Sequence, residues 1–224
     1  MKHLIDPFDL SKEEIDEIVA LGEDIVAHRD RYSGACKGKK LATLFYEPST
    51  RTRLSFTSAR MELGGDVIGF SDARNTSVSK GETIEDTTRV ISCFADIIAM
   101  RHPIEGAPLN ATRVSTIPVI NAGDGSHAHP TQTLTDLLTI KRELGRLDNF
   151  TIGFCGDLKF GRTVHSLINA LVRYPGIRFV LISPEELRVP SYIRENVLDA
   201  QKIPYEEDRD LETAMPSLDI LYMT

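Results

Sequence analysis

The stretch LFYEPSTRTRLSF, residues 44–56, joins the end of an apolar run to the start of a helical pattern. Pro48 interrupts the run, and Ser49 or Thr50 can cap the helix that follows. The first N–H groups of a helix have no partner inside it and carry the positive end of the helix dipole. This turn adds hydroxyl groups at Ser49, Thr50 and Thr52 and guanidinium groups at Arg51 and Arg53. We therefore predict a phosphate-binding turn.

The turn is not a nucleotide-binding P-loop, because GxxxxGK[ST] is absent and the turn holds no glycine. A well-capped helix with two solvated arginines is the plain alternative. Five donors at the end of one strand favour an anion site over that alternative.

Apolar runs alternate with helical patterns along the whole chain, which predicts an α/β fold made of βαβ units with parallel strands. The expected strands are residues 41–46, 66–70, 96–100, 117–120, 151–155, 178–183, 203–205 and 218–223. The expected helices are residues 11–30, 52–63, 84–94, 130–144, 162–173 and 192–201, with short ones near Asn110 and Leu211.

We interpret this pattern as two successive parallel-sheet α/β units joined by a helix. The expected boundaries are residues 1–130 for the first domain, 131–147 for the connecting helix and 148–224 for the second domain. Residues 218–223 read as a buried strand that nothing follows, so we expect the second unit to be incomplete and the chain to be truncated.

Bulk composition narrows the class of protein. The net charge of -7 lacks the basic footprint of a nucleic-acid binder, and the three cysteines form no CxxC pair. No apolar run is long enough to span a bilayer. These features predict a soluble cytoplasmic protein without nucleic-acid or membrane partners.

Two further polar segments follow expected strands. Arg101 lies directly after the expected strand at 96–100. His129 precedes a helix that is expected to begin at Pro130, with Gln132 in its first turn. Helix capping is the plain alternative for His127 and His129, and no third ligand is spaced for a metal. Because the carboxyl ends of parallel strands share one edge, we predict that the 49–53 turn, Arg101 and His129 line one pocket.

Residues 74–87, RNTSVSKGETIEDT, are polar and predict a loop that ends in a capping box between Thr83 and Asp86. Ser77 and Lys80 could reach an anion, although a solvated loop is the simpler interpretation. After the strand at 151–155, GDLKFGRTVHSL places Arg162 at a helix start, where it suits a carboxylate. The glycine spacing there does not match GxGxxG, which argues against a dinucleotide-dependent oxidoreductase. His165 is expected to be structural.

Five motifs in order, FYEPSTRTRLSF, SVSKGETIEDT, MRHP, HPTQTL and GDLKFGRTVHSL, resemble the aspartate/ornithine carbamoyltransferase family over residues 41–224. The EPSTRTR and GDLKFGRT forms resemble its aspartate branch. The resemblance implies transfer of the carbamoyl group of carbamoyl phosphate to L-aspartate, in pyrimidine biosynthesis, with no cofactor and no metal.

The resemblance also implies a role for each matched residue. Ser49, Thr50, Arg51 and Thr52 would bind the phosphate. Thr52, Arg101 and His129 would hold the carbonyl oxygen, with Gln132 near the carbamoyl nitrogen. Arg51, Thr52, Arg101 and His129 would form the catalytic set. Arg162 and Lys80 would bind aspartate. Ser77 and Lys80 would come from a neighbouring subunit, which implies a homotrimer with shared active sites, and Ser79 is a rival for the serine role.

The resemblance leaves some questions open. Family members continue past residue 224 with further aspartate-binding groups, so a chain that binds carbamoyl phosphate without turnover is an alternative. An ornithine-type transferase is another alternative. A regulatory chain is also compatible with the sequence.

Overall fold

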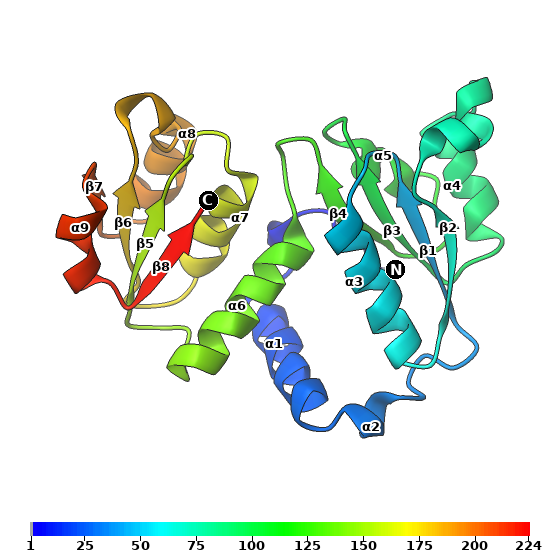
Figure 1. Ribbon diagram of the computed structural model, residues 1–224, viewed down its shortest axis with the longest axis horizontal. Helices are drawn as coiled ribbons and strands as arrows, with labels where there is room; N and C mark the ends of the chain where they lie inside the picture. Colours follow the sequence, from blue (N-terminus) through cyan, green and yellow to red (C-terminus); the bar gives the residue numbers. More distant parts are fainter. Residues whose placement is uncertain (1) are drawn as a thin grey trace. The chain divides into compact units, whose positions relative to one another are not determined.

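The computed structural model describes residues 2–224, which form two compact units (Figure 1). Unit 1 contains the residues up to Leu10 and Ala20–Thr131, and unit 2 contains Ser11–Val19 and Gln132–Thr224. Helix α1, Lys12–Ala27, therefore contributes its first half to unit 2 and its second half to unit 1.

Unit 1 is built on a four-stranded parallel sheet with the order β2-β1-β3-β4. Its strands are β1 (Lys40–Phe45), β2 (Asp66–Phe70), β3 (Ile97–His102) and β4 (Val119–Asp124). Its helices are α2 (Arg29–Tyr32), α3 (Thr50–Glu62), α4 (Ile84–Ser92) and α5 (Ala107–Thr112), with 3-10 turns η1 (Pro7–Asp9), η2 (Ala73–Asn75) and η3 (Ser77–Lys80).

The strand order creates a switch point between β1 and β3. The chain moves from β1 outward to β2 and then returns past β1 to β3 and β4. Since parallel crossovers are right-handed, connections that run in opposite directions place their helices on opposite faces of the sheet. Helix α3 packs on β1 and β2, whereas α4 and α5 pack against each other. Ligands of such sheets bind at the carboxyl ends of the two strands that flank the switch point.

The pairing of β3 with β4 contains a bulge. Met100 pairs with Asn121 and His102 pairs with Asp124, so two residues of β4 lie opposite Arg101 alone. Gly123, one of these two, has a φ of 114°, which favours glycine.

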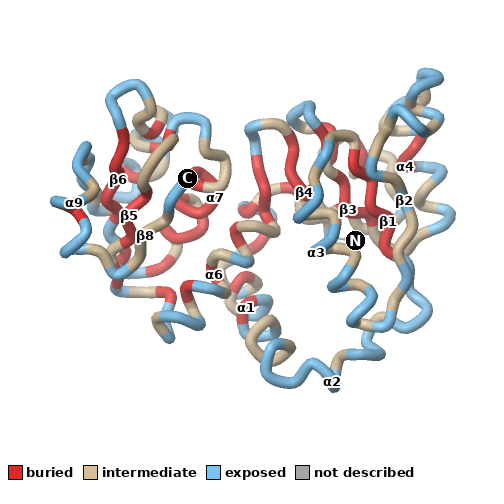
Figure 2. The backbone as a smooth tube through the Cα atoms, in the orientation of Figure 1, coloured by how far each residue is buried: buried red, intermediate tan, exposed pale blue. Residues whose placement is uncertain are grey.

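The core of unit 1 follows from the apolar sequence of its central strands. Residues 41–45 of β1 are all buried, and Figure 2 shows this strand in red beside the more exposed β2. One buried cluster combines a residue near the start of the chain with residues of β1, β3, α5 and β4. It consists of Ile5, Ala42, Leu44, Ile98, Met100, Ala111 and Val119. The sequence of a strand that is buried on both faces is a continuous apolar run rather than an alternation of apolar and polar residues.

Unit 2 has a second four-stranded parallel sheet, with the order β7-β6-β5-β8. Its strands are β5 (Thr151–Cys155), β6 (Arg178–Ile182), β7 (Tyr205–Asp208) and β8 (Ile220–Met223). Its helical segments are α6 (Pro130–Leu144), α7 (Arg162–Leu171), η4 (Glu185–Leu187), α8 (Ser191–Ile193), π-helix η5 (Arg194–Asp199), α9 (Leu211–Ala214) and η6 (Met215–Ser217). The expected two-unit parallel α/β architecture is confirmed.

Local contacts define where helices α1 and α6 begin and end. Ser11 and Glu14 form a capping box before α1, with Glu14 N donating to Ser11 Oγ at 3.2 Å and Ser11 N donating to Glu14 Oε2 at 2.8 Å. Gly145 follows α6 with a φ of 72°, and its N–H donates to Lys141 O at 2.9 Å. Asp16 then accepts a 2.8 Å hydrogen bond from Tyr174 within unit 2.

Three predictions need correction. The expected helix at 192–201 is a short α-turn followed by a π-helix, in which Ala200 N donates to Glu195 O. The wider turn brings Ile193 and Leu198, five residues apart, into buried positions. The expected loop at 74–87 contains η2 and η3, because the side chains of Asp72 and Thr76 cap them. Strand β8 is half-buried rather than buried, because it lies at the edge of its sheet.

Candidate active site

The predicted phosphate-binding turn connects β1 to α3. Ser49 is the N-cap residue of α3 and has an extended backbone, but no side chain caps the helix. The prediction that Ser49 or Thr50 caps it is therefore wrong. The first turn contains no acidic residue, and the side chains of Thr50 and Arg51 are exposed. The first N–H groups of α3 are consequently available to an anion.

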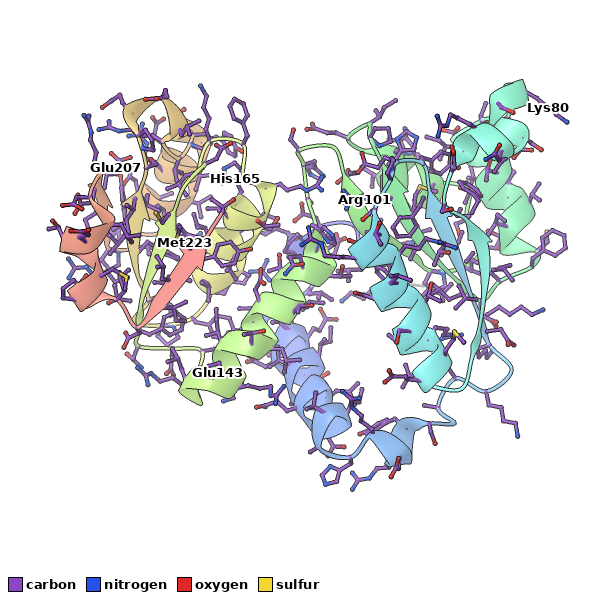
Figure 3. All side chains as sticks on the ribbon, viewed as in Figure 1. Lys80, Arg101, Glu143, His165, Glu207 and Met223 are labelled. Carbon is purple, nitrogen blue, oxygen red and sulfur yellow. The ribbon has the colours of Figure 1, made fainter. Side chains whose placement is uncertain are left out.

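Arg101 lies on β3 beside this turn (Figure 3). Its backbone pairs with Phe45, the last residue of β1, and its O accepts a 2.9 Å hydrogen bond from Tyr46 N. The side chain is largely buried, and its Nε lies 2.7 Å from Glu47 Oε1. Glu47 was missed by the sequence analysis, although it belongs to the same motif. The Glu47 carboxylate therefore forms an ion pair with the guanidinium and restricts its orientation.

His129 lies next to Arg101. A Cβ atom built on Gly123 would lie 3.0 Å from Arg101 Nη1 and 3.4 Å from His129 Cδ2, so both side chains line the space beside this glycine. His129 is 7% exposed, and its Nδ1 lies 3.3 Å from Thr131 Oγ1. Strands β1, β3 and β4 are adjacent and parallel, so the turn at 49–53, Arg101 and His129 share one edge of the sheet as predicted.

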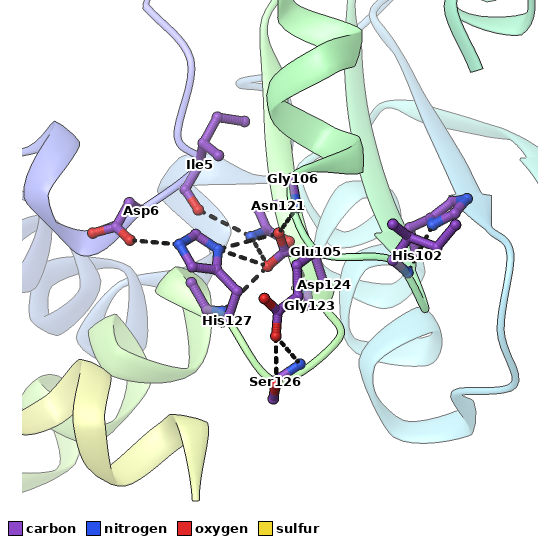
Figure 4. Close-up of polar contacts among 12 residues, drawn as sticks. Ile5, Asp6, His102, Glu105, Gly106, Asn121, Gly123, Asp124, Ser126 and His127 are labelled. Atoms are coloured by element: carbon purple, nitrogen blue, oxygen red, sulfur yellow. Dashed lines mark hydrogen bonds and ion pairs between the residues drawn. The ribbon is translucent and has the colours of Figure 1, made fainter. Parts of the chain in front are cut away.

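His127 does not cap a helix. Its Nδ1 lies 3.1 Å from Asp124 Oδ2, and its Nε2 lies 3.5 Å from Asp6 Oδ2 (Figure 4). Asp124 is fully buried at the end of β4. The sequence analysis did not single out this carboxylate; its only signal was its place at the end of an apolar strand, directly before the histidine segment.

Ser77 and Lys80 lie at the two ends of η3, which follows the edge strand β2. Both residues are exposed, and Lys80 projects from the outer side of unit 1, away from Arg101 (Figure 3). The hydroxyl of Ser79 donates to Thr76 O at 2.7 Å. The predicted Thr83–Asp86 contact is half formed, because Asp86 N donates to Thr83 Oγ1 at 3.1 Å while the Asp86 carboxylate accepts from Arg89.

Unit 2 carries the remaining candidate residues. Gln132 Nε2 donates to Asp136 Oδ1 at 2.8 Å, and Tyr222 donates to Asp136 Oδ2 at 3.2 Å. Burial raises the pKa of Asp136. Arg162 is the first residue of α7, whose N-cap Gly161 supplies no side-chain cap.

His165 is a structural residue, as expected. It is 7% exposed, its Nε2 lies 2.8 Å from Leu158 O, and its Nδ1 lies 3.0 Å from the hydroxyl of Tyr192. Desolvation by burial lowers its pKa. Over residues 2–224, no group of three or more His, Cys, Asp or Glu side chains is arranged to hold a metal ion. No helix within the described part of the chain is long and apolar enough to cross a membrane.

Residues 2–142 match the family described as aspartate/ornithine carbamoyltransferase, carbamoyl-P binding domain. The chain belongs to the aspartate/ornithine carbamoyltransferase family. It is 68% identical over 224 residues to the aspartate carbamoyltransferase catalytic subunit of Lachnoclostridium phytofermentans, covering 100% of this chain and 73% of that protein. The corresponding subunit of Clostridium acetobutylicum is 60% identical over 223 residues, with the same coverage.

Solved structures of family members share the fold. The catalytic subunit of M. jannaschii aspartate transcarbamoylase superposes with a TM-score of 0.93 at 51% identity, over 100% of this chain and 73% of that one. Aspartate transcarbamoylase from Trypanosoma cruzi in complex with carbamoyl phosphate and aspartate gives a TM-score of 0.92 at 35% identity, over 99% of this chain and 76% of that one. The carbamoyltransferase resemblance and the fold predicted from the motifs are confirmed.

Proposed function

We propose that this protein is an aspartate carbamoyltransferase, which transfers the carbamoyl group of carbamoyl phosphate to the amine of L-aspartate and releases phosphate. The observation that carries the proposal is the meeting of Arg101 and His129 beside Gly123, at the switch-point edge where α3 begins without a side-chain cap. The likeness to aspartate carbamoyltransferase catalytic subunits supports aspartate as the acceptor.

In this proposal the phosphate binds at the start of α3. The N–H groups of the first turn and the side chains of Ser49, Thr50, Arg51 and Thr52 donate to its oxygens. The carbonyl oxygen of the carbamoyl group accepts hydrogen bonds from Thr52, Arg101 and His129. These donors act where negative charge develops during the reaction.

The reaction needs no redox step. The lone pair of the neutral α-amine attacks the carbonyl carbon, and a tetrahedral oxyanion forms. The bond from that carbon to the phosphate oxygen then breaks, and phosphate leaves with both electrons of the bond. The amine loses one proton, which the departing phosphate accepts. Donors aimed at the oxyanion each contribute about 2.7–4 kcal/mol in comparable sites.

We assign the two halves of the chain to the two substrates. Residues 1–130 form a carbamoyl phosphate-binding domain, residues 131–147 a connecting helix, and residues 148–224 part of an aspartate-binding domain. Gln132 serves the carbamoyl nitrogen, and Arg162 binds a carboxylate of aspartate. The match of residues 2–142 to a carbamoyl-P binding domain supports the first assignment.

We further infer that Ser77 and Lys80 serve a neighbouring subunit, with Lys80 also binding aspartate. Both residues are exposed on η3, after an edge strand. The Ser79 hydroxyl already donates to Thr76 O, which favours Ser77 over Ser79 for this role. The proposal implies a cytoplasmic homotrimer of pyrimidine biosynthesis and leaves room for a regulatory chain.

The test is product formation from carbamoyl phosphate offered with aspartate and, separately, with ornithine, with the products identified by mass. Carbamoyl aspartate alone is the expected result. Carbamoyl ornithine would contradict the aspartate assignment. Binding of carbamoyl phosphate by calorimetry without any product would instead indicate a chain that binds this substrate and does not turn it over.

A further inference from the structure

The turn at residues 124–128, directly before His129, is closed by one buried carboxylate. Asp124 Oδ1 accepts from Ala128 N at 3.2 Å and from the Asn121 side chain at 2.8 Å. Its Oδ2 accepts from Gly106 N at 2.8 Å, and His127 Nδ1 lies within 3.2 Å of both oxygens. Figure 4 shows these groups converging on Asp124.

The same carboxylate connects two loops of the candidate site. Gly106 belongs to the loop that follows Arg101 on β3, and Ala128 immediately precedes His129 on the loop after β4. Other contacts also join these loops: Gly125 N donates to His102 O at 3.0 Å, and Ser126 donates to Glu105 through both its N–H and its hydroxyl. Asp124 is the one member of this network that is fully buried and binds both loops.

A buried carboxylate is stable only when donors satisfy it, and it orders the groups that donate to it. A neutral amide in its place could not accept at both of its polar atoms, so one loop would lose its anchor. The turn at the start of α3 has no contact with Asp124 among these bonds and would keep its geometry.

We propose that Asp124 is a positioning residue that holds His129 and Arg101 in register for the carbonyl group of the substrate. The inference rests on the proposed function for the identity of that substrate. It assigns to Asp124 an effect on the carbamoyl end of the ligand and none on the phosphate end.

The test compares binding of carbamoyl phosphate with binding of inorganic phosphate by calorimetry. Asp124→Asn is expected to weaken carbamoyl phosphate binding about tenfold through lost hydrogen bonds to its carbonyl oxygen, while the phosphate affinity stays within twofold. Asp6→Asn is the matched control, because Asp6 faces the other nitrogen of His127, whereas the backbone N–H of Ala128 donates to Asp124. It should change neither affinity more than twofold.

Two measurements separate positioning from simple stabilisation. The NMR signal of the His129 ring, assigned with His129→Gln, should move in Asp124→Asn and stay in place in Asp6→Asn. If Asp124→Asn does not fold, His127→Ala removes one donor from a partly exposed position and should reduce the preference for carbamoyl phosphate about threefold.

The outcomes distinguish the two proposals. A wild-type chain that binds phosphate and carbamoyl phosphate equally would contradict the proposed function, and the His129 signal would still test the role of Asp124. The positioning role would be overturned if Asp124→Asn kept the wild-type preference for carbamoyl phosphate over phosphate. In that case the His129 signal would not move, and only the melting temperature would be lower.

Discussion

Each sheet has a strand-to-helix turn beside its switch point. Both helices begin without a side-chain cap, but the loops before them differ. In unit 1 the turn between β1 and α3 has no side-chain cap and no acid in its first helical turn. In unit 2 the turn between β5 and α7 contains Asp157, whose Oδ1 accepts from Lys159 N at 3.1 Å and Phe160 N at 3.0 Å.

This difference predicts two kinds of anion site. The first turn offers backbone donors together with arginines, which suits a phosphate that accepts several hydrogen bonds at once. In the second turn the Asp157 carboxylate already accepts from two loop N–H groups, and Arg162 is the cationic group that begins α7. A single guanidinium suits a carboxylate. The comparison therefore predicts which substitutions affect which substrate.

The largest effect is expected for Arg101→Ala. Its guanidinium is proposed to meet the oxyanion, so kcat should fall about 10²–10³-fold. Arg89→Ala is the control, because Arg89 forms an exposed ion pair with Asp86 on α4. Steady-state kinetics with both substrates saturating will measure the change. A tenfold or smaller loss in Arg101→Ala would show that β3 does not complete the first site.

Arg51→Ala and Arg162→Ala should each weaken the binding of a different substrate. Loss of a charged hydrogen-bond donor costs about 1.5–3 kcal/mol, or roughly 10–150-fold in affinity. We expect Arg51→Ala to lose carbamoyl phosphate binding and Arg162→Ala to weaken aspartate alone. Calorimetry with each ligand measures both. If Arg162→Ala weakened both ligands equally, the division between the two turns would be wrong.

The glycines beside the two sites provide a finer test. In Gly123→Ala the new methyl group would press on Arg101 and His129, so carbamoyl phosphate affinity should fall about tenfold. Gly156 has a φ of 125°, and a Cβ there would lie 2.3 Å from Thr224 O. Both substitutions place alanine at a positive φ and should lower stability by about 1–3 kcal/mol, but Gly156→Ala should leave carbamoyl phosphate affinity unchanged. Carbamoyl phosphate binding by calorimetry, measured on both variants, distinguishes them.

The smallest expected effect concerns pH. Burial lowers the pKa of His165 in unit 2 and of His102 in unit 1 below their usual 6.5. The unfolded chain then binds more protons than the folded chain below about pH 6.5, so stability is lost as the pH falls from that value. Each histidine contributes at most about 1.4 kcal/mol per pH unit.

Denaturant unfolding between pH 7.5 and 5.5 measures that slope. His165→Gln should reduce it by up to one proton. An unchanged slope in His165→Gln would mean that His165 titrates alike in the folded and unfolded chain.

Local patterns were enough to predict most elements of the fold. β2 and β5 begin and end at the predicted residues, because each is a short apolar run flanked by clear turn residues. The π-helix at Arg194–Asp199 could not be predicted, since its i→i+5 bonding depends on where Ile193 and Leu198 are buried.

The placement of the candidate residues was predicted in part. The donors at 49–53 and His129 follow apolar strands, Arg101 lies near the end of one, and strand ends can be located from sequence. The partners of these donors could not be, because Glu47 meets Arg101 and Asp124 meets Gly106 only after separate strands have paired. Acidic residues near turns are common, and their sequence positions do not show which ones are buried.

The bulge opposite Arg101 fixes the number of residues that β4 must have at this place, which substitutions of single residues do not test. In a regular strand, residues three apart face opposite sides, yet Asn121 donates to Asp124 at 2.8 Å because β4 has one residue more than β3 at this place. Deleting Ala122 or Gly123 would leave Asp124 on the face of Asn121 but would remove the bulge that places Gly123 beside Arg101 and His129. Inserting a further residue would shift Asp124 out of this register. Insertions and deletions in this segment should therefore be excluded far more strictly than changes of residue type.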